Sequence, residues 1–172
     1  MKFIDFHTHV FPDELAERAL LHIANDSGIT PSFDGTVAGL KAAINDMPEW
    51  YCAVNCPVAT KPEQVDSINI WASTILDKSL YSFGAIHPDS KNKSRILAEI
   101  KQYGLKGIKL HPEYQKFNPL DDRMTEIWEY CVEHNMIIIT HAGIDAGISE
   151  NVLGTPERFA KLIERYPKMK LI

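Results

Sequence analysis

The chain has 172 residues, a formal net charge of −5, and 45% hydrophobic residues. These values are typical of one globular domain with a sizeable core, which we place over residues 1–172. No cluster of Lys or Arg favours nucleic acid as a partner, and no apolar run approaches the roughly 20 residues that span a bilayer. We therefore expect a small-molecule substrate rather than a nucleic acid or a membrane.

The N-terminus and the cysteines indicate a cytoplasmic protein. A charged residue follows Met1 at once, so the hydrophobic segment of a signal peptide is missing. The three cysteines, Cys52, Cys56 and Cys131, form no CxxC pair. We expect them to be reduced and buried, as is usual for cytoplasmic proteins.

Apolar segments of strand length alternate with segments of helical periodicity along the whole chain. Strands are predicted at residues 2–8, 51–58, 80–86, 105–110, 136–140 and 170–172. Helices are predicted on the apolar stripes at residues 15–23, 37–47, 65–76, 96–103, 124–132 and 159–163, with Pro12 and Pro156 each as the first helical residue. Such alternation predicts βαβ units and a parallel sheet.

Two α/β architectures fit this pattern of five βα units followed by the start of a sixth strand. One is an open, doubly wound sheet. The other is an incomplete (β/α)8 TIM barrel, because a whole barrel needs about 250 residues.

Five of the seven histidines lie at or just beyond the C-terminal ends of predicted strands. They are His7, His9, His87, His111 and His141. Parallel α/β folds build their sites at this edge of the sheet, and histidine is the commonest side-chain metal ligand. The placement therefore predicts a metal site at the strand ends.

The first strand would direct two imidazoles to one side. His7 and His9 are two residues apart, so on a regular strand they share a face and can reach one ion. Asp5 has the same parity and could accept the free ring N–H of a ligand histidine. Phe6 and Thr8 would then face the helices.

Strand parity also predicts polar groups on the inner face of two later strands. Lys109 and His111 would share a face opposite Ile108 and Leu110, where they could bind or polarise an anionic substrate. A solvated edge strand would explain Lys109 equally. His141 follows an apolar strand that would deliver it to the sheet edge, although it could be a hydrogen-bonded core histidine instead. His87 is a candidate for lining the pocket.

Three motifs in this order, FIDFHTHVFP, GIKLHPEYQKFNPLDD and IITHAG, resemble the amidohydrolase superfamily. The resemblance is to the branch related to aminocarboxymuconate semialdehyde decarboxylase. It implies a (β/α)8 barrel with one divalent metal ion, most often zinc, held by His7, His9 and His141. It further implies a hydrolase of C–N or C–O bonds, or a non-oxidative decarboxylase.

The family also has a histidine on the sixth strand and an acid–base aspartate on the eighth, and neither has a counterpart in these 172 residues. We therefore expect the chain to be a fragment that lacks the family's general base. In binuclear branches a carboxylated lysine on the fourth strand bridges two metals, a variant that Lys109 would permit.

Two other functions fit the first motif. One is a TatD-like metal-dependent nuclease, whose sequence also begins with an HxH motif. The GIKLHP strand and the negative net charge of the chain count against this function. The other is a non-catalytic metal-binding or structural fragment. An unclosed barrel would expose edge strands, so a partner copy in a homo-oligomer could cover them.

Overall fold

The computed structural model describes residues 2–45, 50–148 and 152–172. Every paired strand in these residues is parallel to its neighbour. The strands are β1 (Phe3–Thr8), β2 (Trp50–Asn55), β3 (Leu80–Ser82), β4 (Gly84–Ala85), β5 (Gly107–Leu110), β6 (Ile137–Thr140) and β7 (Lys170–Leu171).

The strands form two sheets, β1-β2-β3 and β4-β5-β6-β7, that are joined through a single residue. Phe83 separates β3 from β4, so the predicted strand at residues 80–86 is divided: its first part pairs with β2 and its second part with β5. The spatial order therefore follows the chain order throughout, as in a barrel. A doubly wound sheet reverses its order at a switch point, so this alternative is wrong.

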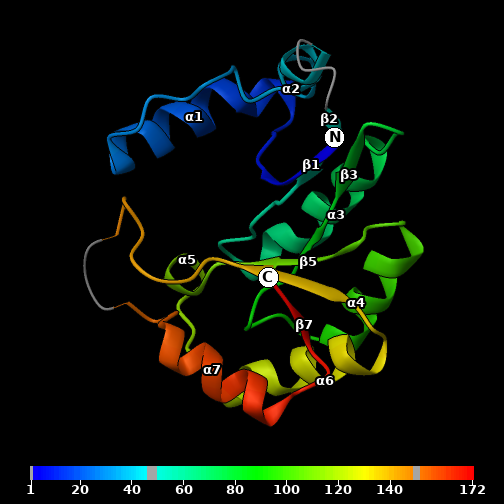
Figure 1. Cartoon of the computed structure of the whole chain (residues 1–172), viewed down its shortest axis with the longest axis vertical. Coiled ribbons are helices and arrows are strands. Elements are labelled where there is room, and N and C mark those ends of the chain that lie inside the picture. The colour runs from blue at the N-terminus through cyan, green and yellow to red at the C-terminus, as the bar shows by residue number, and fades with distance from the viewer. Residues whose placement is uncertain (1, 46–49, 149–151) are drawn as a thin grey trace.

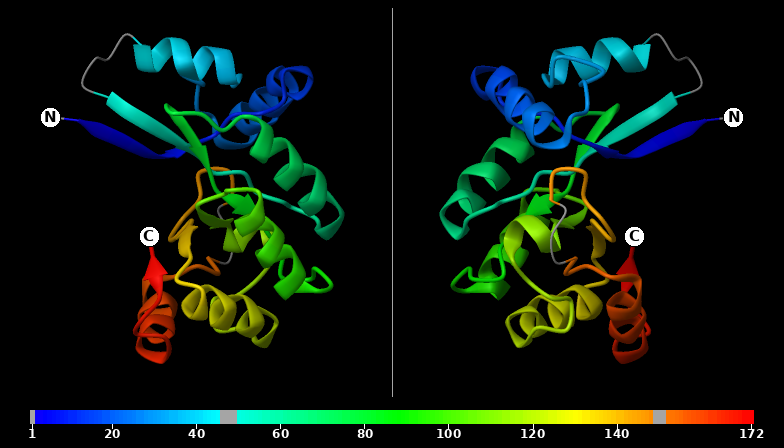
Figure 2. Two further views of the ribbon diagram at one scale, coloured as in Figure 1. Left: turned by 90° about the vertical axis from the view of Figure 1, so that its right-hand side faces the viewer. Right: turned by 90° about the vertical axis from the view of Figure 1, so that its left-hand side faces the viewer.

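Helices connect the successive strands, except β3 and β4, which Phe83 joins (Figure 1). They are α1 (Asp13–Ser27), α2 (Val37–Asn45), α3 (Val65–Thr74), α4 (Lys93–Gln102), α5 (Pro112–Gln115), α6 (Thr125–Glu133) and α7 (Pro156–Arg165), with 3₁₀ turns η1 (Pro62–Gln64) and η2 (Asp122–Met124). Figure 2 shows α1 and α2 at the β1–β2 end of the molecule, and α6 and α7 at the opposite end. None of the described helices is long and apolar enough to cross a membrane.

Local sequence explains where several helices begin and end. Pro156 opens α7 as predicted, and the Thr155 side chain accepts the Arg158 N–H as its N-cap. Pro12 is the N-cap of α1 rather than its first helical residue. Helix α1 ends at Gly28, whose φ of 69° is left-handed. The four-residue helix α5 was not predicted, because Pro112–Gln115 is too short to show a helical period.

The main core lies between the second sheet and helices α4 and α6. Its fully buried members include Leu97 and Ile100 of α4, Ile108 of β5, and Ile127 and Trp128 of α6. All three cysteines are free and buried, as predicted. The chain thus has the predicted incomplete TIM-barrel architecture of five βα units and the beginning of a sixth strand.

Candidate functional site

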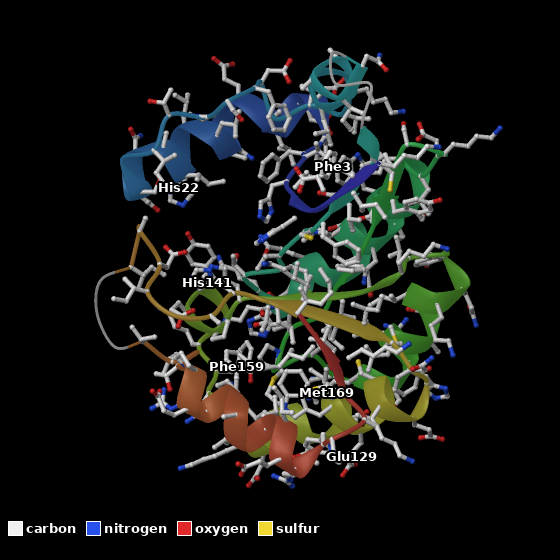
Figure 3. The ribbon with its side chains drawn as sticks, in the orientation of Figure 1. Phe3, His22, Glu129, His141, Phe159 and Met169 are labelled. Carbon is white, nitrogen blue, oxygen red and sulfur yellow. The ribbon has the colours of Figure 1, made fainter. Side chains whose placement is uncertain are left out.

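The C-terminal ends of β1, β5 and β6 carry the predicted polar groups. His7 lies within β1, Lys109 within β5, and His141 directly after β6. Figure 3 shows His141 at the end of β6, with Met169 before β7 at the opposite end of the sheet. Because parallel strands present these ends at one edge, residues far apart in sequence meet there.

Lys109 points into the interior of the sheet and contacts the first strand. Its side chain is among the largest that are fully buried, and the residue is only 1% exposed. Its Nζ lies 2.9 Å from Nε2 of His7. Burial lowers the pKa of Lys109 to about 8. Strand β5 is paired on both sides, so the alternative of a solvated edge strand is wrong.

His7 and His9 lie beside each other, although β1 is less regular than predicted. Their ring centroids are 5.0 Å apart. The register of β1 against β2 shifts between Asp5 and Thr8. Thr8 is buried, and its hydroxyl donates to the Val54 carbonyl at 2.9 Å.

Asp5 contacts the backbone next to this irregularity. Its Oδ1 accepts the backbone N–H of His7 at 3.1 Å. Desolvation and Lys109 lower the pKa of His7, and the Asp5 carboxylate partly opposes them. That Asp5 accepts a ring N–H of a ligand histidine stays a prediction. Phe6, also expected to face the helices, packs edge-on against Phe83 with centroids 5.8 Å apart.

The four imidazoles at this edge influence one another electrostatically. Desolvation, and next the Lys109 ammonium, lower the pKa of His7, and His141 lowers it slightly further. Desolvation, and next His7, lower the pKa of His9, with a smaller effect from His111. His7, His9, His111 and His141 thus share one neighbourhood, where these shifts keep His7 and His9 neutral at pH 7.

His111 is the centre of a column of stacked rings. Its ring is parallel to that of His141 within 5°, with centroids 4.3 Å apart. Tyr114 stacks with His111 as well, with a centroid distance of 4.0 Å. Burial, and next His141, lower the pKa of His111 to about 4.

Asp145 joins this column, and sequence reasoning missed it. Its Oδ2 lies 3.2 Å from Nε2 of His111 and 4.0 Å from Nε2 of His141. Asp145 follows β6 by five residues, in a segment without strand or helix periodicity. A carboxylate four residues after a strand-end histidine, within the glycine-rich HAGIDAG segment, is the signal that could have identified it.

The donor atoms of His111, His141 and Asp145 lie within 4.8 Å of one another, and among the described residues no other three such groups are so close. The predicted set of His7, His9 and His141 is therefore not gathered in this conformation. However, an imidazole binds a metal ion in its ring plane, and no point lies in two parallel planes. The stacked rings of His111 and His141 hence cannot share an ion as they stand.

The donors nevertheless fit a divalent metal ion. Nε2 of His141 is buried and has no hydrogen-bond partner in the described part of the chain, which leaves a donor atom unused. Metal ligation requires neutral imidazoles, and the lowered pKa values of His7 and His9 provide them.

His87 lies apart from this cluster. Its Nδ1 accepts the Asp89 backbone N–H at 3.1 Å. Desolvation lowers its pKa, and the charges that act on it are those of Asp89, Arg123 and Glu63, none of which belongs to the cluster. His87 thus has a local contact with Asp89, and its place in the lining of the pocket stays a prediction.

Three solved structures of similar fold are distant from this chain in sequence. An uncharacterized TIM-barrel protein from Bordetella bronchiseptica has a TM-score of 0.71 at 16% identity, with 99% of this chain and 66% of that chain covered. A 5-carboxyvanillate decarboxylase from Novosphingobium aromaticivorans, in complex with manganese and 4-hydroxy-3-methoxy-5-nitrobenzoic acid, has a TM-score of 0.71 at 14% identity. That match covers 98% of this chain and 63% of the decarboxylase.

A third structure, 4-oxalomesaconate hydratase from Rhodopseudomonas palustris, has a TM-score of 0.55 at 18% identity, and the match covers 98% of this chain and 61% of the hydratase. The chain thus spans less than two thirds of the length of these three proteins, and the likeness concerns the fold. No protein with a curated description matches the chain. The sequence profile of the amidohydrolase family matches residues 4–172, nearly the whole chain, and the chain therefore belongs to the amidohydrolase family.

Proposed function

We propose that this chain forms the metal-binding part of a metal-dependent hydrolase or non-oxidative decarboxylase that acts on a small anionic substrate. The observation that carries the proposal is the convergence of a buried lysine and four imidazoles at the strand ends, where Nε2 of His141 has no hydrogen-bond partner among the residues that the structure describes. Decarboxylase and hydratase structures of the same fold support this class of reaction.

His7, His9 and His141 would hold the metal ion. The ion would lower the pKa of a bound water towards 7 or polarise a substrate carbonyl or carboxylate. We propose Zn²⁺ on the family resemblance, whereas the decarboxylase structure contains manganese, so both ions belong in the test.

Lys109 would attract the anionic group of the substrate. Among the described residues no carboxylate lies within 4.0 Å of its Nζ. Its close polar neighbour is Nε2 of His7, which belongs to an uncharged imidazole. A buried ammonium without a counter-charge is costly, and an incoming carboxylate would offset that cost. His111, on the same face, would contact the substrate through its ring.

Metal binding to the purified chain tests the ligand set. We expect one Zn²⁺ or Mn²⁺ per chain by calorimetric titration, loss of binding in His7→Ala and His141→Ala, and retained binding in His111→Ala. His22→Ala is the matched control, because this histidine is exposed on α1. Unchanged metal binding by His141→Ala would contradict the proposed set.

Activity assays test the reaction class. The intact enzyme should convert members of a panel of aryl carboxylates, lactones and amides, with loss of turnover in Lys109→Met. Cleavage of DNA by the metal-loaded enzyme, without turnover of the panel, would instead indicate the nuclease alternative.

A further inference from the structure

Asn55 is a fully buried polar residue at the C-terminal end of β2. Its Oδ1 accepts the backbone N–H of Val10 at 3.1 Å, and its Nδ2 donates to the hydroxyl oxygen of Ser82 at 3.1 Å. Val10 follows β1 and Ser82 ends β3, so one amide joins the ends of three neighbouring strands.

The orientation of this amide is fixed by its partners. A backbone N–H can only donate, so a flipped amide would place Nδ2 against the Val10 N–H, donor against donor. The Ser82 hydroxyl lies 2.8 Å from the Phe83 carbonyl and 3.3 Å from the Asn55 carbonyl. Its proton goes to the nearer carbonyl, and a lone pair of Oγ remains for Nδ2 of Asn55. The side chain of Asn55 is therefore held at both ends.

His9 lies between two residues that the end of β2 holds. On one side, the Thr8 carbonyl accepts the Cys56 N–H at 2.8 Å. On the other side, Val10 is bound by Asn55 and is only 2% exposed, within the second core cluster. Because the backbone is bound on both sides of His9, the direction of its Cα–Cβ bond is set from β2.

The ring of His9 meets the other imidazoles in this arrangement. Its centroid lies 5.0 Å from that of His7. Desolvation, and next His7, lower the pKa of His9, and a hydrogen bond between its ring and the Cys56 backbone opposes them. A site of this kind requires its groups to be held within about 0.5 Å of the productive geometry. A small shift of the backbone at Val10 would therefore displace the imidazole from a shared ion.

We propose that Asn55 is a positioning residue for His9. Through Oδ1 it holds the backbone that follows His9, and through Nδ2 it ties that backbone to the end of β3. It thereby sets where the His9 imidazole meets a metal ion, as residues behind a ligand commonly do. The effect on metal binding rests on the proposed function, whereas the effect on the conformation of His9 does not.

Asn55→Leu removes both hydrogen bonds of the amide, and Asn69→Leu is the matched control. Asn69 of α3 is also buried, and its amide makes two hydrogen bonds to the Ala85 backbone, at 2.9 and 2.7 Å. Ala85 adjoins none of the proposed ligands in the chain. Both variants should therefore unfold at lower urea concentration than the wild type, but only Asn55→Leu should disturb His9.

Calorimetric titration with Zn²⁺ measures the effect on the ligand set. We expect the Kd to rise by roughly 10–100-fold in Asn55→Leu and by less than about threefold in Asn69→Leu. Equal Kd values in these two variants would overturn the proposal. Asn55→Asp keeps an acceptor for the Val10 N–H, so its Kd should stay within about threefold of the wild type. A rise of about tenfold or more in Asn55→Asp would overturn the proposal even if Asn55→Leu does not fold.

NMR on the metal-free proteins measures the conformation directly. Three-bond couplings from Cγ of His9 to its backbone N and C′ report the χ1 rotamers, and hydrogen exchange reports the Val10 N–H. In Asn55→Leu we expect the minor rotamers to gain population by roughly fivefold and the Val10 amide to exchange about tenfold faster. Neither should change in Asn69→Leu. Equal rotamer populations in the wild type and Asn55→Leu would refute the positioning of His9.

The two readouts separate this proposal from the proposed function. If His7→Ala abolishes Zn²⁺ binding while Asn55→Leu changes neither the Kd nor the rotamers of His9, the positioning role fails and the proposed function stands. If the rotamers respond but the wild-type protein binds no metal ion, the proposed function fails and the positioning of His9 by Asn55 stands.

Discussion

Gln115 connects three strand-end segments through one buried side chain, and its removal should destabilise the site as a unit. Gln115 is only 1% exposed. Oε1 accepts the backbone N–H of His111 at 2.9 Å, and Nε2 donates to the carbonyls of Ala59 at 2.9 Å and Ile86 at 2.7 Å. These partners follow β2, β4 and β5, so the amide ties together the edges of both sheets.

Gln115→Met removes all three hydrogen bonds and keeps a similar side-chain volume. A neutral hydrogen bond contributes about 1 kcal/mol net, and a buried backbone group left without a partner costs about 1–3 kcal/mol. We therefore expect the free energy of unfolding to fall by roughly 3–5 kcal/mol. For a chain of this size, 1 kcal/mol lowers the Tm by about 2–4 °C, so the Tm should drop by roughly 6–20 °C.

Urea and thermal unfolding followed by circular dichroism measure this change. Gln102→Met is the matched control, because this glutamine is exposed on α4 and its replacement should alter stability by less than about 0.5 kcal/mol. A decrease of less than about 1 kcal/mol for Gln115→Met would show that the three hydrogen bonds do not stabilise the strand ends as argued.

Two further variants test how the stability of the fold depends on pH and how closely β5 and β6 approach each other. The hydrogen bond from Lys41 lowers the pKa of Asp77 below its value in the unfolded chain, so the stability it contributes is present above about pH 4 and lost as the pH falls. In urea unfolding, the wild type should be more stable than Asp77→Asn by up to about 1 kcal/mol at pH 6, since the pair is partly exposed, and this difference should shrink as the pH falls below about 4. A difference that does not depend on pH would contradict this. Gly107→Ala would place a Cβ 2.2 Å from the Ile137 carbonyl oxygen, so β5 and β6 must separate. We expect a loss of at least about 2 kcal/mol in the same assay, and wild-type stability would refute the close approach.

Strand order and the strand-end histidines could be predicted because both follow from periodicity and parity. The inward direction of Lys109 was foreseen on the regular strand β5, where parity holds. The register shift between Asp5 and Thr8 could not be predicted, because it depends on how β1 pairs with β2, which no local pattern encodes. The division at Phe83 has the same origin, since it arises from two different pairing partners.

The groups that surround His111 could not be predicted for a different reason. Glu113 and Gln115 are polar residues in a four-residue helix, and their burial depends on backbone groups from segments distant in sequence. Asp145 lies outside any periodic segment. Polar residues in such positions usually face solvent, so only the tertiary structure distinguishes these three.

The stack of His111 on His141 has a consequence for metal affinity. The donor atoms of His7, His9 and His141 do not lie within 4.8 Å of one another, so these side chains must move to bind one ion, and a rotation of His141 towards the other two would break its stack on His111. An aromatic pair of this kind contributes about 0.5–1.5 kcal/mol, which the metal ion has to overcome. In His111→Ala the stack is absent, and we expect Zn²⁺ to bind as tightly as in the wild type or up to about tenfold more tightly. A tenfold weaker affinity in the calorimetric titration would instead make His111 a ligand, with Asp145 and a rotated His141 as the remaining donors.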